Sequence, residues 1–293
     1  MSHFTVAVIT ESLDHLEKML APYQENNMGD CPKQYLAFHN VEDEYRKIYE
    51  NESSEHVQLE DGRVVSPSDA MFRKVTASGT VIGYEVPTHL KRVQVPHRQK
   101  YSSFDDFMMN YEGYGARDEE TGQWGYWENP NAKWDWWTIG GRWSDALMLK
   151  SGKRADAAQI KDIYFIEQDN HEGLTVEIEG YQVPASLAPT FQIMVAEASQ
   201  AWEEVTSGRS LYKPEYYLQR YGDKQSYIRE MMSFSTYAVI TADGEWHAKG
   251  EMGWFGVSSE SPEEAKDFNM SYFKSFIQHA NPEHYLVLVD CHI

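Results

Sequence analysis

The sequence predicts an α+β protein, in which helices pack on a mixed or antiparallel sheet and a β-rich region is inserted. Two apolar runs rich in β-branched residues lie near the ends of the chain, HFTVAVI at residues 3–9 and YLVLV at residues 285–289. Each run is typical of a strand that is buried on both faces. Between residues 61 and 95, short β-branched runs alternate with Gly and Pro, which is typical of hairpins.

The other elements of the first half follow from helical spacing and from turn residues. Residues 11–20 predict a helix, because Leu13, Leu16 and Leu20 share one helical face. Further predicted elements are a polar helix at 41–49, a helix at 102–111 that begins with Ser102, a turn at 129–131, a tight bend at Gly140-Gly141 and a strand at 143–150.

The second half carries clearer boundary signals. Ser261, Pro262 and the acids after them are typical of a helix start, and that helix is expected to continue to about His279. The Asp243-Gly244 pair predicts the turn of a hairpin. Further predicted elements are a strand at 174–184, helices at 191–205 and 214–232, and the hairpin strands at 236–240 and 245–249.

Two domain organisations fit this pattern. A composition shift predicts an N-terminal region at residues 1–175 and a C-terminal region at residues 176–293. Alternatively, the first and last strands pair in one sheet, so that the two ends of the chain close a single domain and the middle is an elaboration.

The chain is strongly acidic, with 46 Asp and Glu against 26 Lys and Arg and a net charge of −20. Such a charge repels phosphate backbones and disfavours direct nucleic-acid binding. Three explanations stay open, namely a solubility surface, attraction to a basic partner, or imitation of a nucleic acid. Acids are dense between residues 42 and 61, and Glu42, Asp43, Glu44 and Glu50 are candidate partner contacts.

Six of the nine tryptophans fall between Trp124 and Trp143. One explanation is a packed core of Trp134, Trp136 and Trp143, with Trp134 and Trp136 on one strand face and Trp137 on the other. A second is a protein interface, since Trp and Arg dominate binding energy. The third is a stacking platform for a sugar or a small nucleotide. Trp137 and Arg142 are the members expected to contact a partner.

The sequence carries no strong catalytic, phosphate-binding or metal-binding motif. Phosphate-binding glycine loops, CxxC or HExxH metal motifs and a GxSxG nucleophile elbow are all absent from the sequence. The terminal residues Asp290, Cys291 and His292 could each bind a metal, but neighbours on a strand point to opposite faces, so a tail that closes a sheet is favoured. The sequence therefore predicts no catalytic residue, metal site or cofactor.

Cellular setting follows from what the sequence lacks. It has no apolar run near ~20 residues and no signal-like start, so neither membrane insertion nor secretion is expected. Two cysteines are too few for a disulfide scaffold, and a reducing cytoplasm fits them.

Four separated segments of the chain resemble a family of uncharacterised proteins from phages and prophages. They are the MSHFTV start, NPNAKWDWWTIGGRW at residues 129–143, KGEMGWFG at residues 249–256, and the DCHI end. Trp137 stands where this family frequently has Tyr, and the regions 42–61 and 62–100 match none of its blocks. In size, acidity and phage association the family is similar to the phage anti-Gabija proteins, which shut down a bacterial nuclease–helicase defence complex.

The resemblance implies a non-enzymatic inhibitor that assembles in several copies around a host defence complex and blocks DNA binding or cleavage. We accordingly expect a homo-oligomer in the cytoplasm of the host bacterium, with no direct contact to nucleic acid or membrane. Two alternatives stay open. The protein is a small-nucleotide sponge or enzyme that uses the Trp-rich segment, or it is a DNA mimic.

Overall fold

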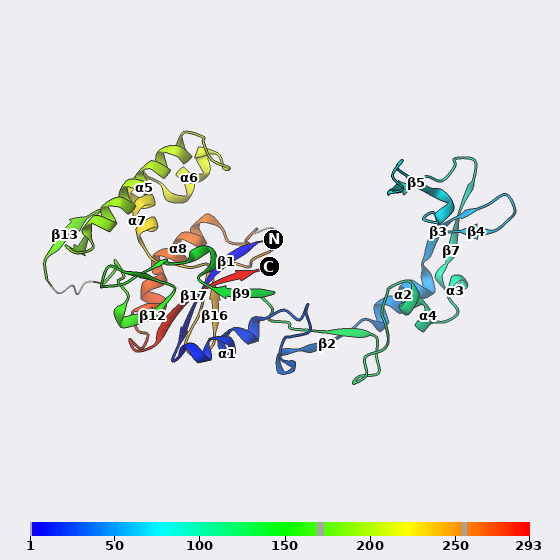
Figure 1. The fold of residues 1–293 in the computed structure, drawn as a ribbon, viewed down its shortest axis with the longest axis horizontal. Coiled ribbons are helices and arrows are strands. Elements are labelled where there is room, and N and C mark those ends of the chain that lie inside the picture. Colours follow the sequence, from blue (N-terminus) through cyan, green and yellow to red (C-terminus); the bar gives the residue numbers. More distant parts are fainter. Residues whose placement is uncertain (1, 169–172, 254–256) are drawn as a thin grey trace. The chain divides into compact units, whose positions relative to one another are not determined.

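The chain divides into two compact units (Figure 1). The structure, a computed structural model, describes residues 2–168, 173–253 and 257–293. Unit 1 comprises Met1–Leu36 and Asn129–Ile293, and unit 2 comprises Ala37–Glu128. This division does not follow the expected boundary between residues 175 and 176. Unit 1 contains both ends of the chain because the first and last strands belong to one sheet.

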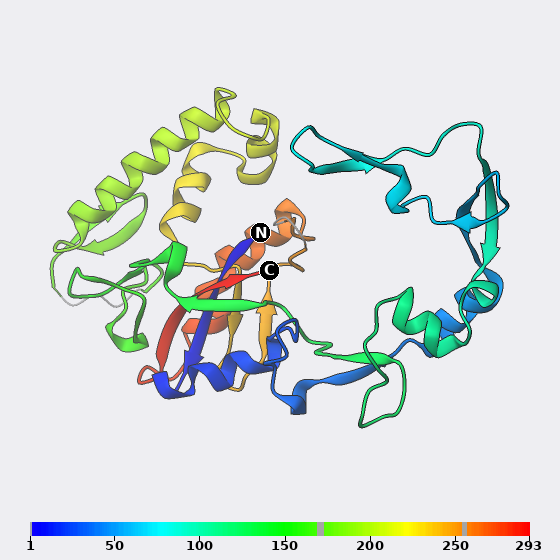
Figure 2. The same cartoon turned by 45° about the vertical axis from the view of Figure 1, so that its right-hand side comes forward.

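Unit 1 is built around a mixed sheet with the strand order β12-β17-β1-β15-β16. At its centre, β1 (His3–Thr10) lies antiparallel to β17 (Tyr285–His292) along its whole length (Figure 2). The predicted pairing of the two terminal strands is therefore present. β15 (Ala238–Ile240) runs parallel to β1 and forms the predicted hairpin with β16 (Trp246–Ala248). The far side of β17 pairs with β12 (Ala157–Gln159) and with β9 (Trp136–Ile139).

Both faces of this sheet are covered, so every residue of β1 and β17 except the first is buried. On one face, Val6 belongs to a cluster with Leu16 of α1 (Leu16–Leu20). On the other face, Ile9 belongs to a cluster with Tyr272 of α8 (Pro262–Tyr272), which continues as a π-helical turn (Phe273–Ile277). The apolar character of both strands is thus explained by burial on two faces.

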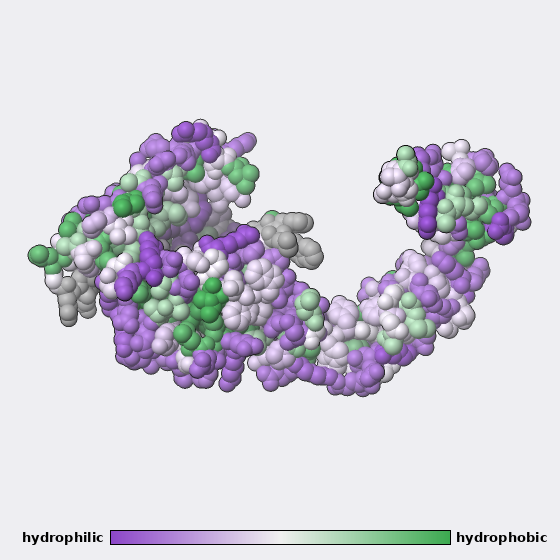
Figure 3. Space-filling view, in the orientation of Figure 1, coloured by the Kyte–Doolittle hydropathy of each residue, from purple (hydrophilic) through white to green (hydrophobic). Residues whose placement is uncertain are grey.

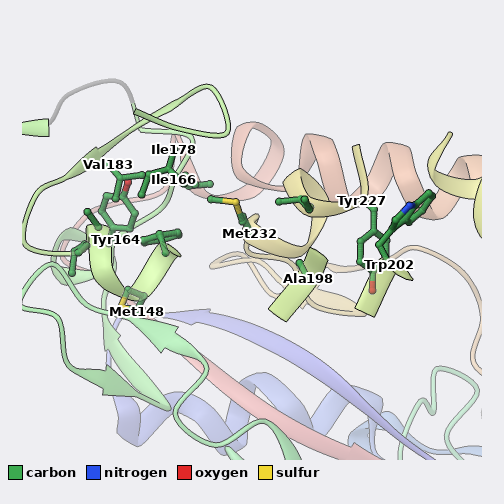
Figure 4. Close-up of a cluster of buried hydrophobic side chains, with 13 residues drawn as sticks. Met148, Tyr164, Ile166, Ile178, Val183, Ala198, Trp202, Tyr227 and Met232 are labelled. Carbon is green, nitrogen blue, oxygen red and sulfur yellow. The ribbon is translucent and has the colours of Figure 1, made fainter. Parts of the chain in front are cut away.

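A helical layer with its own core completes unit 1 (Figure 4). It contains α5 (Ala188–Thr206), α6 (Pro214–Tyr221), α7 (Lys224–Met232) and the hairpin of β13 (Thr175–Ile178) and β14 (Tyr181–Pro184). Trp202 of α5 packs on Tyr227 of α7, with ring centroids 5.4 Å apart. A second small hairpin joins β10 (Leu147–Met148) to β11 (Arg154–Ala155).

Four expected elements differ from the structure, mostly where the backbone takes a left-handed conformation. The predicted strand 174–184 is a hairpin, because Glu179 and Gly180 both have positive φ. The predicted helix 214–232 is two helices, separated by Gly222 at φ +81°. The predicted strand 143–150 is reduced to β10, which follows a 3₁₀ turn at Gly141–Trp143.

The fourth difference concerns the helix expected at residues 11–20. It is a 3₁₀ turn at Leu13–His15 followed by α1, so Leu13 does not share the buried face of Leu16 and Leu20. The predicted start of α8 is confirmed, since Ser261 and Glu264 form a complete capping box.

Unit 2 is made of short hairpins and helices. Its own core gathers Phe107 and Met108 of α4 with Trp124, and the ring of Tyr49 from α2 packs on Phe107. The fold of the chain is thus α+β, with a mixed sheet and several small antiparallel sheets. The elements of unit 2 are β2 (Ala37–Asn40), α2 (Glu42–Asn51), β3 (Ser53–Gln58), β4 (Val64–Val65), β5 (Arg73–Val75), β6 (Val81–Tyr84), β7 (Lys91–Pro96), α3 (His97–Lys100), α4 (Phe104–Asn110) and β8 (Gly125–Glu128).

Candidate functional site

The two ends of the chain meet at one end of the sheet of unit 1 (Figure 2). His3 of β1 lies directly opposite His292 of β17. On the other side of β17, Trp136 of β9 lies opposite His292. Directly opposite residues of neighbouring strands present their side chains on the same face. Three aromatic side chains from distant parts of the sequence therefore form one row.

Each of the two imidazoles is hydrogen bonded through Nδ1 to a carboxylate. His3 Nδ1 lies 2.7 Å from Asp290 Oδ1, and His292 Nδ1 lies 2.6 Å from Asp135 Oδ1. Because an ionised carboxylate only accepts hydrogen bonds, Nδ1 donates in both pairs and Nε2 is left as the other ring nitrogen. We call these four residues, together with Trp136, the paired-histidine cluster.

The backbone of the Gly140-Gly141 bend holds the carboxylate of Asp290 in place. Asp290 Oδ2 accepts a hydrogen bond from the backbone N–H of Arg142 at 3.0 Å. Gly141 has φ +55°, and a Cβ on it would lie only 2.5 Å from Cβ of Asp290. The predicted tight bend is therefore present, and glycine is required there for conformation as well as for space. Asp135 is held similarly, since its Oδ1 accepts from the backbone N–H of Trp136 at 2.7 Å.

The rings of the cluster contact one another closely. The centroids of His3 and His292 are 5.0 Å apart, and the indole of Trp136 stacks on His292 at 5.0 Å with an interplanar angle of 17°. The side chains of His3 and His292 are only 11% and 7% exposed. Nε2 of His292 is buried and has no hydrogen-bond partner among the described residues. A buried polar atom without a partner costs about 1–3 kcal/mol, so the packing of this ring opposes stability at that nitrogen.

A third carboxyl group lies near the cluster. Burial, followed by the charge of Asp135, raises the pKa of Glu25 above its usual range, and His292 opposes this effect. The surroundings of the two imidazoles are therefore acidic. Within the described part of the chain, no Lys or Arg side chain forms an ion pair with Asp135 or Asp290.

The hydrogen bonds of the two imidazoles determine which ring nitrogen is available for chemistry. An imidazole that donates Nδ1–H to a carboxylate presents Nε2 as a base or as a metal ligand. Across residues 2–168, 173–253 and 257–293, no three or more His, Cys, Asp or Glu side chains are grouped so that they could hold a metal ion. The cluster thus offers two imidazoles and no complete set of protein ligands.

Sequence reasoning missed this cluster, although one signal was present. It ended the last strand at Val289 and treated Asp290, Cys291 and His292 as a tail that closes a sheet. The tail does close the sheet, and Cys291 is buried in its core. Pairing the two terminal strands residue by residue would have placed His3 opposite His292.

The Trp-rich segment does not form one cluster, because it crosses from unit 2 into unit 1. Trp124 is buried in the core of unit 2, where Nε1 donates to Asp105 at 2.9 Å. Trp134 is buried in the sheet core of unit 1, as the core interpretation expects. Trp143 is half-buried and lines a cavity of about 160 Å³ beside Thr5.

The predicted faces of Trp134, Trp136 and Trp137 are wrong. β9 begins only at Trp136, and Asp135 lies in a bend before it, so Trp134 is outside the strand alternation. Trp134 and Trp137 both pack in the sheet core, whereas Trp136 is 46% exposed. Trp137, expected to contact a partner, is half-buried against this core. Arg142 is exposed, as a partner contact requires.

The four acidic candidates all lie on α2, and they differ in exposure. Asp43, Glu44 and Glu50 are exposed. Glu42 is partly buried and forms an ion pair with Arg117, so its carboxylate contributes to the packing of unit 2.

No family model matches this chain, and no curated protein or solved structure is significantly similar to it. Within the described ranges, no helix is long and apolar enough to cross a membrane.

Proposed function

We propose that this protein acts by binding a partner protein through unit 2. The observation that supports this proposal is the hairpin of β5 and β6, which exposes apolar side chains. Ile82 is 67% exposed, and Val75, Val81 and Tyr84 are each more than two-fifths exposed. Such grouped exposed apolar residues are typical of protein-binding surfaces. Hydrophobic atoms reach the surface of unit 2 in Figure 3.

Unit 2 carries both an acidic and a basic segment, which supports recognition of a protein whose surface also carries both kinds of charge. The exposed carboxylates of Asp43, Glu44 and Glu50 lie on α2. Residues 62–100, which include the hairpin, carry seven Lys and Arg against two acids. Complementary charge speeds association and selects among partners more than it raises affinity.

We propose as the partner a Gabija-type nuclease–helicase complex of a host bacterium, as the resemblance to phage proteins implies. Several copies of the chain assemble on this complex in the bacterial cytoplasm and block DNA binding or cleavage. No catalytic step of the protein itself is needed for this activity.

The two alternative functions have less support. A nucleotide sponge at the Trp-rich segment needs a ligand pocket, but the cavity that Trp143 lines is about 160 Å³, below the ~300 Å³ at which such pockets begin. A DNA mimic needs a continuous acidic surface, but the basic region 62–100 lies in the same unit as α2.

Mixing experiments test the proposal. The purified chain is combined with several Gabija complexes, and co-purification and DNA cleavage are measured. Ile82→Asp is expected to weaken the complex at least tenfold, because a charge replaces an apolar contact. The triple variant D43N/E44Q/E50Q is expected to slow association and to reduce its salt dependence.

Leu211→Asp is the matched control, since Leu211 is 91% exposed in unit 1. It is expected to leave binding unchanged. Equal losses from Ile82→Asp and Leu211→Asp would contradict a contact through unit 2. Absence of a complex together with undiminished cleavage, across all complexes tried, would remove the proposal.

A further inference from the structure

We propose that unit 1 binds a small aromatic carboxylate, with the ring of the ligand in the cavity that Trp143 lines and its carboxylate on Arg154. Every described residue that lines this cavity belongs to unit 1. The site is therefore separate from the protein-binding surface of unit 2 and does not depend on it.

The cavity lies where the sheet of unit 1, its helical layer and the β10–β11 hairpin come together. Its lining includes Thr5 of β1, Phe191 of α5, Met232 of α7 and Met148 of β10, and the last two are labelled in Figure 4. Its volume is about 160 Å³. Because an apolar cavity of about 150 Å³ accommodates one benzene ring, this cavity suits a single aromatic ring, although it is too small for a nucleotide.

The side chains around the cavity favour an aromatic ligand. The lining includes the rings of Phe165, Phe191 and Phe234 and the thioethers of Met194 and Met232. Phe165 and Phe234 already contact each other edge to face, with ring centroids 5.8 Å apart and an interplanar angle of 72°. Aromatic rings attract a further ring in the same way, and methionine sulfur makes favourable contacts with ring edges. An aromatic ring therefore gains contacts here that an aliphatic group of the same size lacks.

The charge at the cavity favours an anionic ligand. Of the described residues that line it, Arg154 alone carries a charge. Arg154 is exposed and lies directly opposite Met148 in the β10–β11 pair, so the two side chains share one face of the hairpin. Met148 is buried on the cavity wall, which directs Arg154 to the entrance of the cavity.

The guanidinium of Arg154 is available to an external carboxylate. In the described part of the chain, ion pairs occupy other arginines, among them Arg92, Arg117 and Arg220, but not Arg154. A guanidinium binds a carboxylate through two parallel hydrogen bonds. Its single positive charge also matches a carboxylate better than a phosphate, which carries a second negative charge near neutral pH.

The test is calorimetric titration of the full chain with phenylacetate. One site per chain is expected, with a dissociation constant of about 0.1–1 mM, which is reasonable for a ligand with so few atoms. Phenethyl alcohol has nearly the same shape without the charge, so it is expected to bind about tenfold more weakly. Acetate has the charge without the ring, and no binding of acetate is expected in the same concentration range.

Substitutions on the β10–β11 hairpin separate the charge from the cavity. Arg154→Gln is expected to weaken phenylacetate binding about tenfold and to leave phenethyl alcohol binding unchanged, because only the charge is removed. Lys153→Gln is the matched control, since Lys153 is the exposed neighbour and is not part of the cavity lining as described. It is expected to bind both compounds as the native chain does.

A third variant fills the cavity itself. Ala146 lines the cavity and is half-buried, so Ala146→Leu places additional methyl groups in the space for the ring. It is expected to abolish binding of both compounds. Circular dichroism establishes that each variant is folded. If Ala146→Leu unfolds, the comparison of Arg154→Gln with Lys153→Gln decides the question, because both residues are exposed.

Three results would overturn the inference. The first is the absence of phenylacetate binding to the native chain at millimolar concentrations. The second is an equal loss of affinity in Arg154→Gln and Lys153→Gln, which would show general attraction of an anion to the basic hairpin. The third is unchanged binding of phenylacetate to a folded Ala146→Leu variant, which would place the ligand outside this cavity.

Discussion

Gly141 is the position where a single methyl group is expected to disturb the paired-histidine cluster. In Gly141→Ala the backbone must hold φ +55°, which costs an L-residue about 1–2 kcal/mol. The new Cβ also lies within contact distance of the Asp290 carboxylate, which must move. Its hydrogen bond from the Arg142 N–H is then lost, at about 1.5–3 kcal/mol for a charged acceptor. The expected loss of unfolding free energy is about 2.5–5 kcal/mol.

Gly208→Ala isolates the contact from the backbone effect. Gly208 also has a left-handed φ of +79°, but an added Cβ would meet nothing within 4 Å. Its expected cost is therefore the backbone strain alone, about 1–2 kcal/mol. Urea unfolding followed by circular dichroism measures both variants, and equal slopes are needed for the comparison, because two units can unfold separately. A loss in Gly141→Ala no larger than in Gly208→Ala would refute the proposed role of the close approach.

Two further predictions concern buried and titrating charges. Arg220→Met leaves the carboxylate of Glu230 buried without its ion-pair partner, so a loss of about 3–5 kcal/mol is expected in thermal or urea unfolding; a loss below about 1 kcal/mol would contradict this. The pKa of Asp105 is lowered, first by the hydrogen bond from Arg117 and then by that from Trp124. The ionised Asp105 therefore stabilises the folded state above the ordinary aspartate pKa, and this stabilisation is lost as the pH falls through the lower pKa of the folded state. Stability of unit 2 measured from about pH 6 to pH 2 should therefore fall on acidification, and Asp105→Asn should flatten this dependence, whereas an unchanged pH profile would exclude Asp105 as a cause.

Elements with local boundary signals could be predicted from the sequence. The helix that starts after Ser261 and the hairpin at Asp243-Gly244 are both present, because capping and turn formation involve residues only a few positions apart. The helix expected at 214–232 was divided by Gly222. Hydrophobic spacing continues across this residue, so periodicity alone did not show that the backbone turns there.

The high Trp content of residues 124–143 suggested a single cluster, but this segment passes from the core of unit 2 into the core of unit 1. Residues 124–143 are a single anomaly in the sequence, but Trp124 stabilises unit 2 and Trp134 stabilises unit 1. Density of a residue type along the chain does not specify which core each side chain enters. Burial depends on the long-range contacts of each unit, and these are set by pairing in the sheet and by packing.

The sequence by itself determined that both terminal strands are buried, that the fold is α+β, and that the chain carries a charge of −20. These properties follow from the residues within each segment. Only the tertiary structure decided that His3 faces His292 and that Asp135 and Asp290 bind their rings. The physical reason is register: backbone hydrogen bonds between β1 and β17 choose which residues are opposite, and a shift of one residue would place these side chains on different faces.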